Sequence, residues 1–187
     1  MEFQGIQYRT ADNWFPHVPV AELGQRPIKY LEIGALHGAN LLSVARTYAA
    51  HPESELHAID PWVDYAEYPE AYEQATGYET FMANVARSGY QHKIRVHRGF
   101  SHVEQARLED NSFDLIYIDG NHEPEYVLED AVLAFRKLKV GGYLVFDDVG
   151  WGGPDEVSKG IHAFCDGYHK RIRKIAETDQ AWVQKIK

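Results

Sequence analysis

Three acidic residues and one histidine follow two apolar runs in the second half of the chain. Asp119 comes directly after the run LIYI, with His122 close behind it. Asp147 and Asp148 come directly after the run YLVF. Ligands of parallel sheets lie at the carboxyl ends of the strands, where converging carboxylates repel one another unless a cation binds. Oxygen ligands favour Mg²⁺ or Ca²⁺, so the pattern predicts a cation site made of these three acids. The alternative is that one or two of the acids cap helices or face water.

His122 is the predicted general base for chemistry at this place. An imidazole titrates near neutral pH, and this one lies three residues after Asp119. His37 is a second candidate, because it lies in a turn that contains glycines. The chain has ten histidines, most of which are expected to be solvated, so position rather than residue type carries the prediction.

A second group of residues suited to ligand binding follows the first apolar run, in the sequence EIGALHG (32–38). Glycines at such a place let the backbone turn tightly and approach a ligand. Leu36 replaces the middle glycine of G-x-G-x-x-G, and no Gly-Lys-Ser/Thr ending follows, which argues against dinucleotide and phosphate-loop sites. Asp60 ends the second run, where an acid would accept hydrogen bonds from a ribose or form a turn before Pro61. Trp62 would cover an adenine ring or cap the core.

Apolar runs alternate with helical patterns along most of the chain. Strands are predicted at 28–35, 55–60, 93–99, 113–120 and 141–148, and helices at 39–50, 77–89, 124–139 and 157–164. This alternation is typical of a parallel sheet covered on both faces. The runs RIRKIAETD and AWVQKI predict a closing hairpin with a turn at Asp179 and Gln180. The expected fold class is α/β: Rossmann-like and doubly wound, with a seven-stranded, mostly parallel sheet and a C-terminal antiparallel hairpin, in one domain over residues 1–187.

The composition argues against several classes of partner and compartment. With a net charge of −9, the chain has little affinity to gain from phosphate backbones, which argues against nucleic acid as a partner. Cys165 is the one cysteine, so no internal disulfide forms and a reducing cytoplasm is expected. The longest apolar runs are strand-length, so no membrane span is expected, and the N-terminus lacks the pattern of a signal peptide.

The motifs taken together resemble a known family. The runs YLEIGALHGAN, HAIDPW, GFS, FDLIYIDGNHEPEYVLEDA and GGYLVFDDV resemble, in this order, the class I S-adenosylmethionine-dependent methyltransferases. The subgroup they resemble is the small O-methyltransferases with an IDG-x-H motif. The resemblance covers residues 28–149, apart from a Tyr-rich stretch at 64–77 that is expected to be a substrate-side insertion, and it leaves out the N-terminal segment 1–27. It implies that S-adenosylmethionine is held by Glu32, Gly34, Gly38 and Asn40 at the turn, Asp60 at the ribose, Phe100 and Ser101 near the adenine, and Asp119 at the methyl-transfer face.

These expectations combine into methyl transfer to a hydroxyl of a small-molecule acceptor, such as a sugar or a polyol. A cation on the three acids would lower the pKa of the hydroxyl, and His122 would take its proton. No lysine closely follows Asp119, so the resemblance does not imply a catechol-type mechanism. Two other functions remain open: a non-catalytic nucleoside-binding domain with a regulatory or assembly role, and an NAD-type oxidoreductase. The short chain also leads us to expect a homodimer in which a partner subunit completes the pocket.

Overall fold

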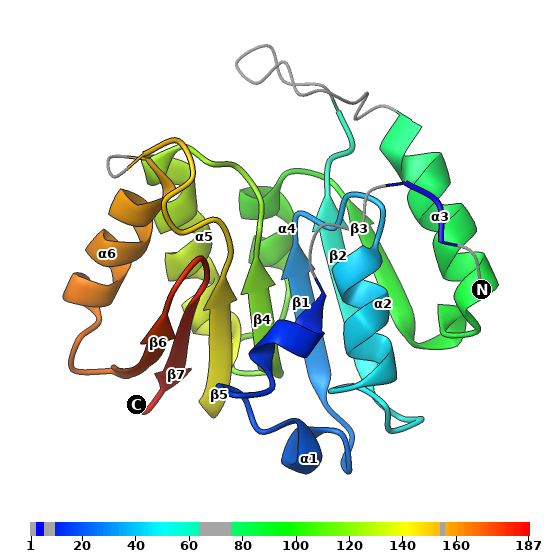
Figure 1. The fold of residues 1–187 in the computed structure, drawn as a ribbon, viewed down its shortest axis with the longest axis horizontal. Coiled ribbons are helices and arrows are strands. Elements are labelled where there is room, and N and C mark those ends of the chain that lie inside the picture. Colours follow the sequence, from blue (N-terminus) through cyan, green and yellow to red (C-terminus); the bar gives the residue numbers. More distant parts are fainter. Residues whose placement is uncertain (1–2, 6–9, 64–75, 154–155) are drawn as a thin grey trace.

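The computed structural model describes residues 3–5, 10–63, 76–153 and 156–187, which surround one seven-stranded sheet (Figure 1). The strand order is β3-β2-β1-β4-β5-β7-β6, in which β1 to β5 are parallel and β7 is antiparallel to both of its neighbours. This confirms the predicted Rossmann-like sheet and its C-terminal hairpin. The strands are β1 Lys29–Ile33, β2 Glu55–Asp60, β3 Ile94–Arg98, β4 Phe113–Ile118, β5 Leu138–Phe146, β6 Ile172–Glu177 and β7 Ala181–Lys185.

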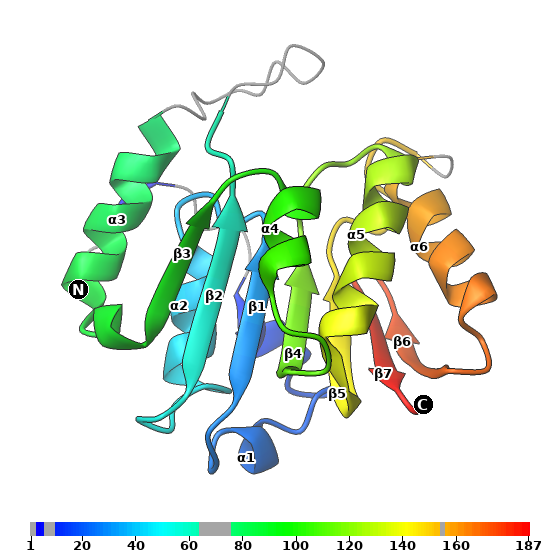
Figure 2. The same cartoon turned by 180° about the vertical axis from the view of Figure 1, so that it is seen from behind.

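Helices cover both faces of the sheet, as Figures 1 and 2 show from opposite sides. The alternation of side chains along β1 shows how each face is filled: Tyr30 packs with the α2 side, and Leu31 packs with the α5 side. Both side chains are fully buried. The helices and 3-10 turns are η1 Ala11–Trp14, α1 Val20–Leu23, α2 Ala39–Arg46, α3 Gly77–Ser88, η3 Gln91–Lys93, α4 Ser101–Arg107, α5 Pro124–Lys137 and α6 Val157–Gly167.

The connection between α5 and β5 differs from the prediction. We expected Gly141 and Gly142 to lie after the helix and to begin the strand, but α5 ends at Lys137 and β5 begins at the next residue. Gly141 has a φ of +88°, and a Cβ on Gly142 would lie 2.9 Å from the carbonyl oxygen of Asp114. The register between β4 and β5 also shifts here, so the two glycines form an irregularity inside the strand rather than a loop before it.

The N-terminal segment packs on the body of the domain. The backbone N–H of Ala11 donates to Ser43 Oγ at 2.8 Å, and the Trp14 ring is fully buried in the core. Of the predicted insertion at 64–77, residues 64–75 lie outside the described part of the chain, and Gly77 begins α3.

The carboxyl ends of the central strands meet at one edge of the sheet, and each is followed by a residue singled out from the sequence. The backbone ladder continues past the strands: Gly34 N–H donates to Ile59, Asp119 N–H to Ile33, and Asp147 N–H to Ile118, at 2.8–3.0 Å. These bonds fix the starting points of the turns that carry the candidate site.

Candidate functional site

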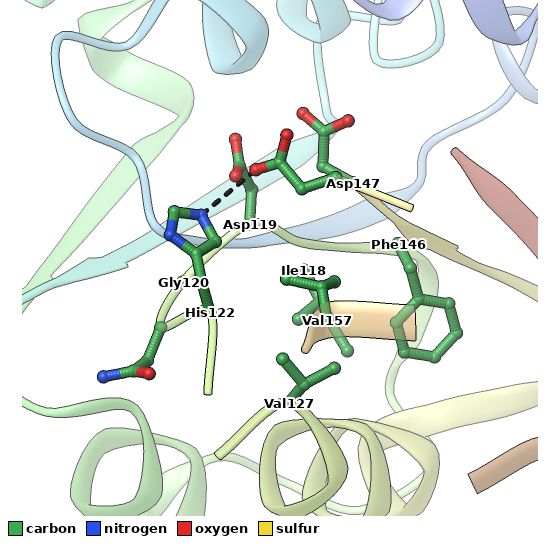
Figure 3. Close-up of a pocket in the computed structure, with 10 residues that line it drawn as sticks. Ile118, Asp119, Gly120, His122, Val127, Phe146, Asp147 and Val157 are labelled. Atoms are coloured by element: carbon green, nitrogen blue, oxygen red, sulfur yellow. Dashed lines mark ion pairs between the residues drawn. The ribbon is translucent and has the colours of Figure 1, made fainter. Parts of the chain in front are cut away.

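Asp119, His122 and Asp148 come together after β4 and β5. Figure 3 shows Asp119 and His122 at this place. The Nε2 atom of His122 lies 3.1 Å from Oδ2 of Asp148. One ligand atom from each of the three residues lies within 4.8 Å of the others, and no other such group of three occurs in the described ranges. The predicted base and two of the three predicted acids therefore form one compact group.

A small pocket lies beside this group. In Figure 3 the polar side chains gather on one side of it and the apolar side chains on the other. The space that it encloses is about 10 Å³, enough for about one water molecule. Most of an acceptor would therefore lie over the mouth of the pocket. The apolar lining consists of Ile118, Val127, Phe146 and Val157.

Asp119 occupies the electrostatic centre of the group. Burial raises the pKa of Asp119 well above its usual range, and the neighbouring carboxylates of Asp147, Asp148 and Glu32 raise it further. The Tyr117 hydroxyl, 3.3 Å from Asp119 Oδ2, acts in the opposite direction. Negative charge is therefore unfavourable at Asp119 unless a cation or a positively charged ligand compensates it.

Asp147 lies beside the group but outside it. The Tyr117 hydroxyl donates to Oδ2 of Asp147 at 2.5 Å, and Gln180 Nε2 donates to Oδ1 at 3.0 Å. Gln180 in turn accepts a bond from Trp14 Nε1 at 3.1 Å. Both carboxylate oxygens of Asp147 are thus held by protein donors, and the structure brings His122, in place of Asp147, into the compact group with the other two acids. Trp14 and Gln180 carry no local sequence signal for this contact, since they lie 166 positions apart.

The glycine turn passes directly against the end of β4. Gly34 has a φ of +84°, and a Cβ there would lie 1.6 Å from the carbonyl oxygen of Asp119. Gly38 has the same φ and precedes α2. Leu36, which stands where a dinucleotide motif has its middle glycine, also adopts a left-handed conformation with a φ of +42°. The turn therefore has a glycine-like backbone at a position where the sequence shows leucine.

Asp60 and Trp62 hold Leu36 in this conformation. Asp60 Oδ2 accepts the Leu36 N–H at 2.9 Å, and Trp62 Nε1 donates to the Leu36 carbonyl at 2.7 Å. Asp60 ends β2, as the predicted ribose acid should, and its other oxygen accepts the Trp62 N–H at 2.7 Å. The Trp62 ring is 1% exposed and packs against Tyr78 and Phe81. Of the two roles expected for Trp62, the structure shows the cap on the core.

Glu32 and Asn40 connect the end of β1 to the start of α2 on either side of the turn. The buried Glu32 carboxyl accepts bonds from the Tyr30 hydroxyl, Asn40 Nδ2 and the Leu41 N–H. Burial raises the pKa of Glu32 to about 8, although these three donors lower it. Asn40 Oδ1 is buried without a hydrogen-bond partner in the described structure, so it is an acceptor that the amine of a bound cofactor would satisfy. These bonds connect Glu32 to β1 and to the start of α2, so Glu32 fixes the position of the turn, and its predicted contact with the cofactor stays a prediction.

The other predicted site residues lie around this edge. His37 is 8% exposed, and burial lowers its pKa, so it is less suited than His122 to contact an acceptor. Phe100 is 47% exposed and precedes α4, where a nucleobase could contact it. Ser101 begins α4 and hydrogen-bonds to Asp130, a residue whose pKa burial raises to about 7. The predicted adenine contacts of Phe100 and Ser101 stay predictions. Helix α4 was not expected from the sequence, because its seven residues show no apolar period.

A family of methyltransferase domains matches residues 31–149 of this chain. The chain belongs to this family. The matched residues run from β1 to just past β5, so they contain the glycine turn, Asp60 and the group formed by Asp119, His122 and Asp148. The predicted class I methyltransferase resemblance is thereby confirmed.

Solved structures of methyltransferases share the fold of this methyltransferase domain. The O-methyltransferase TomG from Streptomyces achromogenes, which is involved in tomaymycin synthesis and was solved with S-adenosylmethionine, is 20% identical, with a TM-score of 0.66. The alignment covers 89% of this chain and 77% of TomG. Cofactor-bound Rv0187 from MTB is 19% identical, with a TM-score of 0.69, and the alignment covers 98% of this chain and 84% of Rv0187. The O-methyltransferase NovP is 15% identical, with a TM-score of 0.64 and coverage of 94% and 79%. At these identities the likeness shows the fold.

A curated relative is the uncharacterized protein R132 of Acanthamoeba polyphaga mimivirus. It is 27% identical over 121 residues, which are 65% of this chain and 51% of the viral protein. The chain thus spans about half the length of the curated relative it matches. Among the helices of the described ranges, none has the length and apolar character needed to cross a membrane.

Proposed function

We propose that this domain transfers the methyl group of S-adenosylmethionine to a hydroxyl of a small-molecule acceptor. The observation that carries the proposal is the pair formed by His122 and Asp148, 3.1 Å apart and next to Asp119. The pair stands at the edge of the sheet where the glycine turn and Asp60 also lie. A base and a cofactor turn at one edge are the two parts that methyl transfer requires.

The cofactor part rests on the turn. Gly34 and Gly38 give the turn after β1 a left-handed backbone, and Oδ1 of Asn40, at the start of α2, has no hydrogen-bond partner among the described residues. The sulfonium of S-adenosylmethionine supplies the driving force of the reaction, so the protein mainly holds the acceptor in line and removes its proton. A domain that bound the nucleoside without catalysis would need the turn but not the paired His122.

His122 supplies the base in this proposal, and Asp148 orients it. The acceptor oxygen forms a bond to the methyl carbon while the carbon–sulfur bond breaks, and S-adenosylhomocysteine leaves. The hydroxyl proton passes to the imidazole of His122, whose positive charge the Asp148 carboxylate stabilises. The negative charge of the acidic residues at this edge favours a neutral acceptor, such as a sugar or another ring alcohol, over an anionic one.

A divalent cation fits the same group. Burial, followed by the neighbouring carboxylates of Asp147 and Asp148, raises the pKa of Asp119, and a cation beside its carboxyl would offset both effects. Asp119 and Asp148 would hold Mg²⁺ or Ca²⁺, which would lower the pKa of a bound hydroxyl. Asp147, whose oxygens are held by Tyr117 and Gln180, would act by shaping the site.

The test is release of S-adenosylhomocysteine during incubation with S-adenosylmethionine and a panel of hydroxyl compounds. We expect His122→Gln and Asp148→Asn to lose at least about 100-fold in turnover, as removal of a general base does. His162→Gln is the matched control. His162 also pairs with a carboxylate, since its Nε2 lies 2.9 Å from Oε1 of Glu177, but this exposed pair is not part of the site. Unchanged turnover in both site variants would refute the base assignment. Cofactor binding without turnover of any compound would favour the non-catalytic alternative.

A further inference from the structure

One aromatic side chain at this edge has no role in the scheme above. Trp151 is 44% exposed, whereas Trp14, Trp62 and Trp182 are between 0% and 3% exposed. Its ring centre lies 4.3 Å from that of His122, at an interplanar angle of 35°. Several other large apolar side chains of this chain are equally exposed, so it is the contact with the candidate base His122 that distinguishes Trp151.

The backbone that carries Trp151 is specifically built. Asp148 adopts a φ of +57°, and Gly150, Gly152 and Gly153 also have positive φ values. The turn is closed by a bond from the Trp151 N–H to the Asp148 carbonyl at 2.9 Å. The Gly150 N–H donates to Ser158 Oγ at 2.8 Å. A left-handed aspartate is unfavourable, and such strain persists where the surrounding structure enforces it, often at functional sites. One turn therefore sets the positions of both Asp148 and Trp151.

The size of the pocket leads to the same region. The space enclosed between the strand ends and the apolar residues Val127 and Val157 is about 10 Å³, so it admits only a small group of an acceptor. The remainder of a molecule whose hydroxyl reaches His122 must lie over the mouth, next to the Trp151 ring, which is tilted against His122. An indole surface at that place favours a ligand with a flat apolar face, because such a face displaces water from the indole.

We infer that Trp151 is the acceptor-binding platform and that the acceptor is a neutral ring compound, either an aromatic ring or the flat face of a sugar, with its hydroxyl directed at His122. This inference rests on the proposed function. An open-chain polyol presents no flat face to the indole and binds weakly. Trp151 thus determines specificity, while His122 performs the proton transfer.

The direct probe is phenyl β-glucopyranoside, which carries both kinds of ring, with sorbitol as the open-chain comparison. Since the other three tryptophans are buried, acrylamide quenching of protein fluorescence reports mainly on Trp151. In the presence of S-adenosylhomocysteine, we expect phenyl β-glucopyranoside to protect the fluorescence from acrylamide and sorbitol to leave it unchanged. Equal protection by the two compounds, or protection by neither, would overturn the inference.

Kinetics on the best ring acceptor from the panel separate this inference from the proposed function. Trp151→Ala should raise the KM for the acceptor about tenfold with kcat within about threefold, and Trp151→Phe should recover most of the loss. Binding of S-adenosylhomocysteine should not change in either variant. Phe15→Ala is the control, because Phe15 is 43% exposed and contacts Tyr48. Methyl transfer with an unchanged KM in Trp151→Ala refutes the platform alone, whereas absence of methyl transfer to any compound refutes the proposed function as well.

Discussion

Replacement of Glu32 by Gln should stabilise the domain at neutral pH. Burial raises the pKa of Glu32 from its ordinary value of 4.5 to about 8, so the folded chain keeps a proton that the unfolded chain has lost. Such an acid stabilises the fold fully below pH 4.5, and this contribution is lost as the pH rises to 8. Glutamine resembles the neutral acid at every pH and removes this penalty.

The expected magnitude follows from the two pKa values. At about 1.4 kcal/mol for each pH unit above 4.5, the linkage at pH 7 destabilises the wild type by about 3 kcal/mol. The new amide can donate to the Tyr30 hydroxyl, and its carbonyl can accept the Leu41 N–H. Asn40 can turn its amide so that Oδ1, which has no partner in the described structure, accepts the second N–H. We therefore expect Glu32→Gln to gain about 2 kcal/mol at pH 7 after some loss of geometry.

The assay is urea unfolding of both proteins at several pH values between 4.5 and 8.5. Asp119 and Asp130 also have raised pKa values, so the wild-type curve alone does not isolate Glu32. The difference between variant and wild type does, and it should grow from near zero at pH 4.5 to its maximum above pH 8. A variant that is less stable than the wild type at pH 7, with a difference independent of pH, would show that the three donors keep Glu32 ionised and would refute the reasoning.

Four further substitutions, one of them the control Gly141→Ala, test the turn and the acid group by urea unfolding. Gly34→Ala should lower the free energy of unfolding by more than about 3 kcal/mol, because its Cβ would lie 1.6 Å from a backbone oxygen. Gly141→Ala, at a similar φ but with open space around it, should lower it by about 1 kcal/mol. Equal losses in the two variants would contradict the close approach at Gly34. Asp148→Asn should raise the free energy of unfolding by about 1 kcal/mol, because it removes the repulsion between Asp148 and Asp119, while turnover is lost. A reduced stability would show that the pairing of Asp148 with His122 outweighs this repulsion. Gln180→Leu should lose about 2 kcal/mol, because Asp147 Oδ1 loses its buried donor, and an unchanged midpoint would show that this bond contributes nothing.

The parts of the structure that follow from local patterns could be predicted from the sequence. The five parallel strands are apolar runs bounded by turn residues, and the alternation with helices fixes which ends share an edge. The acids after β4 and β5 were therefore expected at one place. The pairing of Asp148 with His122 was not expected, because the direction of a side chain after a strand depends on backbone angles. Asp148 has a φ of +57°, a value that favours glycine or asparagine.

Long-range contacts decide the remaining features. Trp14 reaches Asp147 through Gln180, and no local pattern connects residues from the two ends of the chain. Leu36 takes a left-handed conformation because Asp60 and Trp62 hold its N–H and carbonyl, although leucine by itself disfavours that backbone. These positions are set by tertiary bonds that compete with local preference, as is expected near a functional site.

The most direct test of the methyltransferase account is a calorimetric titration of the wild-type chain with S-adenosylhomocysteine, once with Mg²⁺ and once with a chelator. The account predicts saturable binding of one molecule per chain in both runs, with a difference between runs that reports the cation at Asp119 and Asp148. No heat beyond dilution in either run would contradict the central claim that the glycine turn binds this cofactor.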